Sequence, residues 1–248
     1  MNTKKQRVMQ KKSKKYDFIL PIGQACYTAY ALRKINYRFT SGPFDWVYGA
    51  GLESRLKLFL SRFEHFFEKE DLEFVETKEE NDVYQNNQTG LIFNHDFPKN
   101  CNFDQDYIDV FSKYTKRIGK TLKFIDKSKK ILLLYIEIPN HALAVDEKKL
   151  LELVKKANEM YKGKNIDLLY IRHDQNMEKG RVEYQDLSQN VTIATCYNLD
   201  DDPKTPEWVA NYEATYKVLD YVKLTHPIIN ALKWKIKKFK KELFKNKK

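Results

Sequence analysis

The sequence has few of the residues that build small cross-linked folds. Its 248 residues include eight glycines and three cysteines, and Cys26, Cys101 and Cys196 stand 75 and 95 positions apart. This spacing excludes a disulfide scaffold and a zinc knuckle, and it favours a reducing compartment. There is also no glycine-rich phosphate loop and no Gly-x-Ser-x-Gly motif. We therefore expect neither a metal nor a cofactor.

Long apolar segments are absent as well. The longest run, Ile131–Ile138, contains Glu137 and is less than half of the roughly 20 residues that span a bilayer. The apolar stretch after the basic N-terminus, Phe18–Gly23, is too short for a secretory signal and follows directly on Asp17. We expect a soluble protein in the cytoplasm.

Acidic residues are nearly absent from both ends of the chain. Residues 1–15 hold seven basic residues and no acid, and residues 233–248 hold nine lysines against one glutamate. The net charge of the two ends is +15, whereas that of the whole chain is +11. Residues 16–232 therefore have a net charge of −4. A domain that reads a nucleic-acid groove concentrates basic charge within its fold, so we expect no specific nucleic-acid partner.

Three regions follow from this pattern. Residues 1–15 are expected to be a basic disordered tail, 16–226 an α/β domain, and 227–248 a basic amphipathic helix. In the last region, apolar residues recur every three or four positions among lysines. Such a helix binds anionic membrane surfaces, here the inner membrane face through Lys233–Lys248. Packing of the same stripe on the body is an equally open alternative.

Apolar patterns between residues 16 and 226 predict strands that alternate with helices. Strands are predicted at 16–22, 72–75, 83–85, 91–93, 131–138, 167–171 and 191–196, and helices at 26–35, 52–67, 103–125, 150–161 and from 205 onward. The near-continuous apolar runs indicate a single domain with a mainly parallel sheet and helices on both faces. Ligands of such sheets bind at the carboxyl ends of the strands. Cys26, His141 and His173 each follow a predicted strand, so we expect them at one edge.

Cys26 stands where a predicted helix begins. Free backbone amides and the helix dipole favour a thiolate at this position, which makes a cysteine nucleophilic near neutral pH. The same amides can hold an oxyanion after the sulfur attacks a carbonyl. An inert buried cysteine is the alternative interpretation.

The segment around Cys26 resembles a bacterial family of unknown function whose members are described as papain-like cysteine peptidases. The resemblance rests on Ile22–Cys26, on Arg38 and on Ser41–Trp46, with the Pro-Phe-Asp-Trp run as its most specific part. Residues 93–97 and 169–172 resemble two weaker family blocks, and Gly42 stands where an aromatic residue is expected. The resemblance implies a peptidase with a cysteine nucleophile and a peptide or acyl-bearing substrate.

A papain-like site needs a histidine that accepts the thiol proton and a third group that orients the imidazole. His95 is the first candidate for the base, because it lies in the second family block, and Asp45 is the candidate that orients it. His173 is the alternative base, and His141 is a weaker one. The candidates for substrate binding lie in the family segment: Gly23, Gln24, Arg38 and Trp46.

Two other functions fit the sequence. The α/β pattern also accommodates an esterase or acyltransferase in which Cys26 takes the usual position of a serine. The basic ends fit a non-catalytic adaptor at the inner membrane face, for instance in bacterial surface-polysaccharide assembly. The sequence gives no indication of the oligomeric state.

Overall fold

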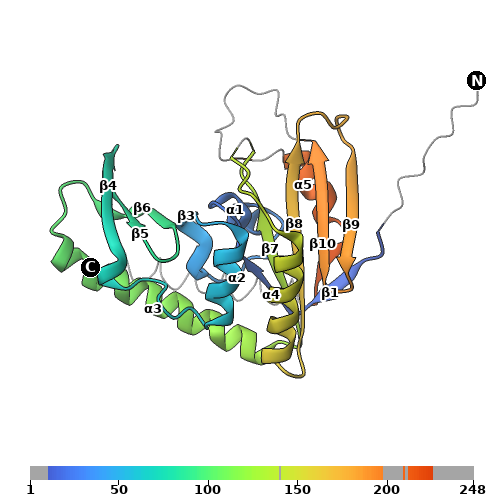
Figure 1. Cartoon of the computed structure of the whole chain (residues 1–248), viewed down its shortest axis with the longest axis horizontal. Coiled ribbons are helices and arrows are strands. Elements are labelled where there is room, and N and C mark those ends of the chain that lie inside the picture. The colour runs from blue at the N-terminus through green and yellow to red at the C-terminus, as the bar shows by residue number, and fades with distance from the viewer. Residues whose placement is uncertain (1–10, 140, 198–208, 210–211, 226–248) are drawn as a thin grey trace, which may run out of the picture.

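The computed structural model describes residues 11–139, 141–197, 209 and 212–225 (Figure 1). Its elements, with η for short 3-10 helices, are β1 (Lys14–Tyr16), β2 (Phe18–Pro21), α1 (Tyr27–Lys34), η1 (Pro43–Trp46), β3 (Tyr48–Gly49), α2 (Leu52–Leu60), η2 (Lys69–Asp71), β4 (Leu72–Lys78), β5 (Asn81–Asn86), β6 (Leu91–Pro98), α3 (Phe103–Lys127), β7 (Lys130–Ile136), α4 (Glu147–Met160), β8 (Asn165–Asp174), β9 (Val182–Ser188), β10 (Val191–Tyr197), α5 (Tyr212–Leu219) and β11 (Val222–Leu224).

A five-stranded sheet forms the centre of the molecule, in the strand order β2-β7-β8-β10-β9. The first four strands run parallel, and β9 pairs antiparallel with β10. In β7, six of the seven residues are buried. Because both faces of this strand are covered, its sequence shows a continuous apolar run instead of an alternation.

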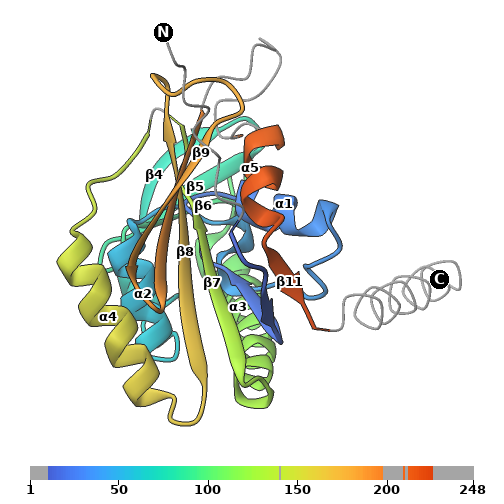
Figure 2. The same ribbon diagram turned by 90° about the vertical axis from the view of Figure 1, so that its right-hand side faces the viewer.

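Helices cover both faces of this sheet (Figure 2). On one face, Leu134 and Ile171 pack in a core to which α1 and α5 contribute. On the other face, Leu133 and Leu168 pack in a larger core with residues of α2, α3 and α4. Successive side chains of a strand point to opposite faces, so each central strand supplies both cores.

A second, four-stranded sheet is antiparallel throughout, in the order β3-β6-β5-β4. The 25-residue helix α3 contacts β6 of this sheet and β2 of the central sheet, and so connects the two. Aromatic rings fill the space between the helix and the second sheet, among them Phe66, Phe67, Phe93, Phe97, Tyr107 and Tyr114.

The prediction of a mainly parallel sheet is wrong. The molecule is a single α/β domain with mixed sheets, because residues 72–98 form an antiparallel meander and β9 adds an antiparallel edge strand. In β4, six of the seven residues are exposed. A strand of this kind has no apolar run that would reveal its length or its partner. The direction of pairing is set instead by the tight turns that join β4 to β5 and β5 to β6.

The ends of the described chain meet in a small parallel pair, in which β1 is bonded to β11. Lys14 and Lys15, which we expected in a disordered tail, thus belong to the strand β1. The predicted helix at 227–248 and the start of the helix predicted from 205 lie outside the described residues. Within the part that the structure covers, no helix combines the length and the apolar character needed to span a membrane.

Candidate active site

Cys26 lies five residues beyond the end of β2, at the position where α1 begins, and its side chain is half-buried. β2, β7 and β8 are adjacent and parallel. The chain therefore brings Cys26, His141 and His173 to the same edge of the central sheet, as the three apolar runs predicted. We call residues 22–26 the cysteine loop.

Gln24 fixes the cysteine loop to the chain that follows β7. Its backbone N–H donates to the carbonyl of Ile136 (3.2 Å). Its side-chain oxygen accepts from the N–H of Ile138 (3.0 Å), and its side-chain nitrogen donates to the carbonyl of His141 (2.8 Å). Gln24 is 2% exposed. Both ends of its amide are thus engaged by the backbone, so in this structure Gln24 positions the loop, while its predicted role in substrate binding stays a prediction.

Arg55 of α2 fixes the same loop from the other side. The guanidinium is fully buried, and it donates to the carbonyls of Gly49 (2.8 Å), Ala50 (3.1 Å) and Gln24 (3.3 Å). It also lies over the ring of Phe44, 5.2 Å from the centroid. Burial lowers the pKa of Arg55 to about 10, so the group is cationic at neutral pH and its donors bind strongly. No described carboxylate is bonded to it, and its Nη1 is buried without a partner.

Replacement of Arg55 tests this anchoring. Arg55→Met should lower the free energy of unfolding by at least about 2 kcal/mol, because three carbonyls lose a charged donor. Lys57→Met is the matched control, since Lys57 lies on the same helix in an exposed pair with Glu53, and it should change stability by less than about 0.5 kcal/mol. Urea denaturation measures both variants. Equal effects would contradict the role of Arg55.

Gly23 is a steric constraint on the loop. A Cβ atom at this position would lie 1.7 Å from Oγ1 of Thr28 and 3.2 Å from the amide nitrogen of Ile136. The first turn of α1 therefore packs directly on the backbone of the loop, and only a glycine permits this approach. The role predicted for Gly23 in substrate binding is not tested by this packing.

Gly23→Ala should accordingly destabilise the protein by about 1–3 kcal/mol, because the loop must move away from α1. Gly119→Ala provides the control: a Cβ there meets nothing within 4 Å, and in the interior of α3 it should stabilise by about 0.5–1 kcal/mol. Thermal and urea unfolding of the two variants should give shifts of opposite sign. An unchanged or increased stability of Gly23→Ala would show that the loop is not tightly packed.

The electrostatic environment of Cys26 differs from the sequence-based expectation. Burial raises the pKa of the thiol above its ordinary value, and the backbone amide of Cys26 itself offsets this in part. No side chain among the described residues caps the start of α1, so within this part of the chain the amides of its first turn are available to an anion. The structure thus holds a neutral thiol beside free donors.

His173 lies on the same face of the central sheet as α1. Ile171, two residues earlier, packs in one core with Tyr27 of α1, and so does Cys196, which stands opposite His173 in the β8–β10 register. Both ring nitrogens of His173 are buried, and neither has a hydrogen-bond partner among the described residues. Burial lowers its pKa to about 4, so the imidazole is neutral at pH 7.

Glu137 holds the backbone of His173 in place. One carboxylate oxygen accepts from the N–H of His173 (2.7 Å), and the other accepts from the hydroxyl of Tyr170. Glu137 is 4% exposed. Burial raises its pKa, and the two hydrogen bonds act in the opposite direction. The carboxylate thereby links the segment after β7 to the end of β8.

His95 belongs to the second sheet. It lies on β6, is exposed, and meets the ring of Trp46 edge-on with centroids 6.4 Å apart. Trp46 itself is 39% exposed. Asp96 is engaged elsewhere, with the hydroxyl of Tyr114 (2.7 Å) and the ammonium of Lys113. The contacts of His95 within the described chain do not lead to Cys26.

Asp45 closes the turn that carries the Pro-Phe-Asp-Trp run. Its buried carboxylate accepts from the N–H of Gly42 (2.8 Å) and from Nε of Arg38 (3.0 Å), and Arg38 also reaches the hydroxyl of Ser41 (3.3 Å). Burial raises the pKa of Asp45, and the charge of Arg38 opposes this. Its hydrogen bonds reach neither Cys26 nor a histidine, so the predicted roles of Asp45 as orienting group and of Arg38 in substrate binding stay predictions.

Two residues of the site were not singled out from the sequence. Arg55 falls on the apolar stripe formed by Leu52, Leu56 and Phe59, and a charged residue on such a stripe signals a buried partner. Glu137 interrupts the longest apolar run of the chain and carries the same signal. In the described part of the molecule, no group of three or more His, Cys, Asp and Glu residues is arranged to hold a metal ion.

The buried imidazole makes stability depend on pH. The pKa of His173 is lowered from 6.5 to about 4, so the unfolded chain binds the proton more readily. Its contribution is complete above about pH 6.5 and is lost as the pH falls toward 4, by up to about 3 kcal/mol. The unfolding free energy of His173→Gln should fall less between pH 7 and pH 4.5 than that of the wild type and of His95→Gln. Identical slopes would show that His173 is hydrated in the native state.

Comparisons with known proteins show the family of this chain. A family model described as "putative papain-like cysteine peptidase (DUF1796)" matches residues 17–176. The uncharacterised protein R408 of Acanthamoeba polyphaga mimivirus is 26% identical over 155 residues, which cover 54% of this chain and 69% of that protein. Since that relative is viral, a bacterial origin is not confirmed. No solved structure matches.

Proposed function

Because the chain belongs to the family described as putative papain-like cysteine peptidases, we propose that it is a hydrolase in which the sulfur of Cys26 attacks an acyl carbonyl. One observation carries the proposal. Two half-buried residues, Cys26 and His173, reach the same edge and the same face of the central sheet, and the ring nitrogens of His173 are buried without a partner among the described residues. Buried ring nitrogens without a hydrogen-bond partner cost stability, and such groups are found at functional sites.

The proposed reaction begins with a neutral pair. The imidazole of His173 accepts the thiol proton as the sulfur of Cys26 bonds to the carbonyl carbon, and the carbonyl oxygen becomes an oxyanion. The amides at the start of α1 stabilise this oxygen. The C–N or C–O bond then breaks, the leaving group takes the proton from His173, and a thioester remains. Water, deprotonated by His173, hydrolyses the thioester and restores the thiol.

His173 is preferred to His95 as the base because of its location and burial. The cysteine loop is connected with β8 through β7. Gln24 is hydrogen-bonded to Ile136, and Ile136 is paired with Ile171, which lies two residues before His173. His95 lies on the separate antiparallel sheet and is exposed. His141 also lies at the right edge, but its side chain is exposed.

The substrate class is proposed as a peptide, following the family description. An ester or another acyl group reacts by the same steps, so esterase or acyltransferase activity is the alternative within this mechanism. A cytoplasmic location, and contact of Lys233–Lys248 with an anionic membrane, are proposed from the sequence. The alternative proposal, a non-catalytic adaptor at the inner membrane face, depends on residues 227–248 and does not require Cys26.

Alkylation kinetics test the pairing of Cys26 with His173 without knowledge of the substrate. At pH 7, His173→Gln should slow alkylation of Cys26 by iodoacetamide at least about fivefold, because the proton acceptor is lost. His95→Gln should leave the rate unchanged. Rates are read from the carboxamidomethylated peptide by mass spectrometry. If only His95→Gln slows the reaction, the base is misassigned.

Turnover tests the nucleophile. On a panel of fluorogenic peptides and aryl esters, Cys26→Ala should abolish hydrolysis, and His173→Gln should lower kcat by about 100-fold or more. Cys101→Ala, at another half-buried thiol, is the control and should retain full activity. Hydrolysis that survives in a folded Cys26→Ala protein would rule out the proposed mechanism.

A further inference from the structure

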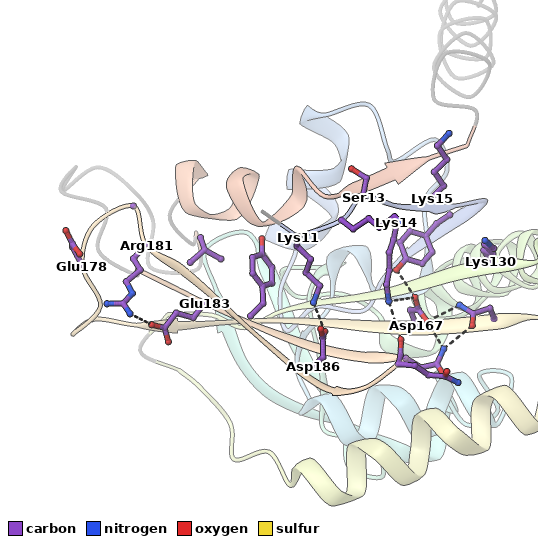
Figure 3. A pocket seen from close by; sticks show the side chains of 18 of the residues that line it. Lys11, Ser13, Lys14, Lys15, Lys130, Asp167, Glu178, Arg181, Glu183 and Asp186 are labelled. Atoms are coloured by element: carbon purple, nitrogen blue, oxygen red, sulfur yellow. Dashed lines mark hydrogen bonds and ion pairs between the residues drawn. The ribbon is translucent and has the colours of Figure 1, made fainter. Parts of the chain in front are cut away.

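A groove of about 1830 Å³ lies outside the proposed active site, between the N-terminal segment, the strands β8 and β9 and the turn before β10 (Figure 3). The residues that line it include Asn165, the first residue of β8, and Arg181, the residue before β9. Four lysines line the groove from the N-terminal side: Lys11, Lys12, Lys14 and Lys15. Two of these lysines reach across to the strands, and their binding sites define the chemistry of the groove.

The ammonium group of Lys11 is enclosed by four side chains. It lies 2.5 Å from the carboxylate of Asp186 and 3.3 Å from the hydroxyl of Thr192. It also lies 5.0 Å from the ring centroid of Tyr184 and 5.4 Å from that of Tyr221. The side chain of Lys11 is only 14% exposed. A carboxylate with two aromatic faces is the arrangement by which proteins recognise an organic cation.

The four partners are held in place by one another. The two tyrosine rings meet edge-to-face, 5.5 Å apart, and the hydroxyl of Thr192 donates to the carboxylate of Asp186 (2.7 Å). They come from β9, from β10 and from the residue just before β11. The pocket is therefore built by the folded body and does not depend on Lys11 for its shape.

Lys14 occupies a second site three residues further along. Its ammonium lies 3.2 Å from the carboxylate of Asp167 and 3.2 Å from the carbonyl of Gln189. Asp167 is 5% exposed and also accepts from the hydroxyl of Tyr16 (2.8 Å). Lys12, between the two docked lysines, is exposed. The body thus selects the first and fourth residues of the segment Lys11–Lys14.

We propose that the two ammonium-binding sites beside this groove form a recognition site for basic peptides with lysines three positions apart, and that the side chains of Lys11 and Lys14 occupy these sites as intramolecular ligands. Another peptide with the same spacing competes for the site. The proposal is independent of the chemistry of Cys26. It predicts that removal of Lys11 and Lys14 leaves a vacant site that accepts the peptide in trans.

The test uses the full-length protein and the fluorescein-labelled peptide acetyl-Lys-Lys-Ser-Lys-amide, with anisotropy as the readout. The variant Lys11→Ala/Lys14→Ala should bind this peptide at least tenfold more tightly than the wild type. Lys12→Ala, at the exposed lysine, is the matched control and should bind as the wild type does. Tyr184→Leu and Asp186→Asn, each added to the double variant, should abolish the gain. Equal binding by all variants, or a gain that survives Tyr184→Leu, would overturn the proposal.

The reactivity of the lysine amines in the wild-type protein provides a second test. With sulfo-N-hydroxysuccinimide acetate, Lys11 should be acetylated at least fivefold more slowly than Lys12, as measured by peptide mass spectrometry. Tyr184→Leu should bring the two rates together. Similar rates for Lys11 and Lys12 in the wild type would show that the pocket is not occupied in solution and would contradict the proposal.

Discussion

The attachment of the cysteine loop to β7 and α2 is the constraint on which the rest of the site depends. Gln24 is bonded through its backbone and through both ends of its side chain, and the buried guanidinium of Arg55 holds its carbonyl. Gly23 lets the first turn of α1 pack on the loop. Cys26 therefore stands on a rigid support at the edge where the parallel strands end, which is the place where α/β folds bind ligands.

The charge states of Cys26 and His173 follow from burial. Burial raises the pKa of the thiol and lowers that of the imidazole, so both groups are neutral in the resting structure. Since ion-pair formation is disfavoured in this environment, the proposed mechanism requires that proton transfer accompany attack on the substrate or follow its arrival. In that mechanism, a carbonyl oxygen placed against the amides of α1 supplies the stabilisation that the two neutral groups lack.

Patterns of buried residues explain what the sequence could and could not predict. The apolar runs of β2, β7 and β8 placed Cys26, His141 and His173 at one edge, because strands covered on both faces show their burial directly. The polar strand β4 and the edge strand β9 carry no such run, so the mixed character of the sheets was missed. His95 and Asp45 were chosen for their position in family-like segments, and the structure gives both of them other contacts. The apolar stripe of α2 indicates that Arg55 is buried, but it does not identify the partners of Arg55, because backbone carbonyls leave no pattern in a sequence.

Competition among the three cysteines for a limiting alkylating reagent tests the central claim most directly. With one equivalent of iodoacetamide at pH 7.5 and peptide mapping, Cys26 should carry most of the label, because the proposed mechanism gives its half-buried thiol a proton acceptor, whereas Cys196, which stands opposite His173 in the β8–β10 register, is fully buried. Cys101 is also half-buried, and Cys196 is buried, so both serve as internal references. Preferential labelling of Cys101, or equal labelling of Cys26 and Cys101, would contradict the assignment of Cys26 as a nucleophile.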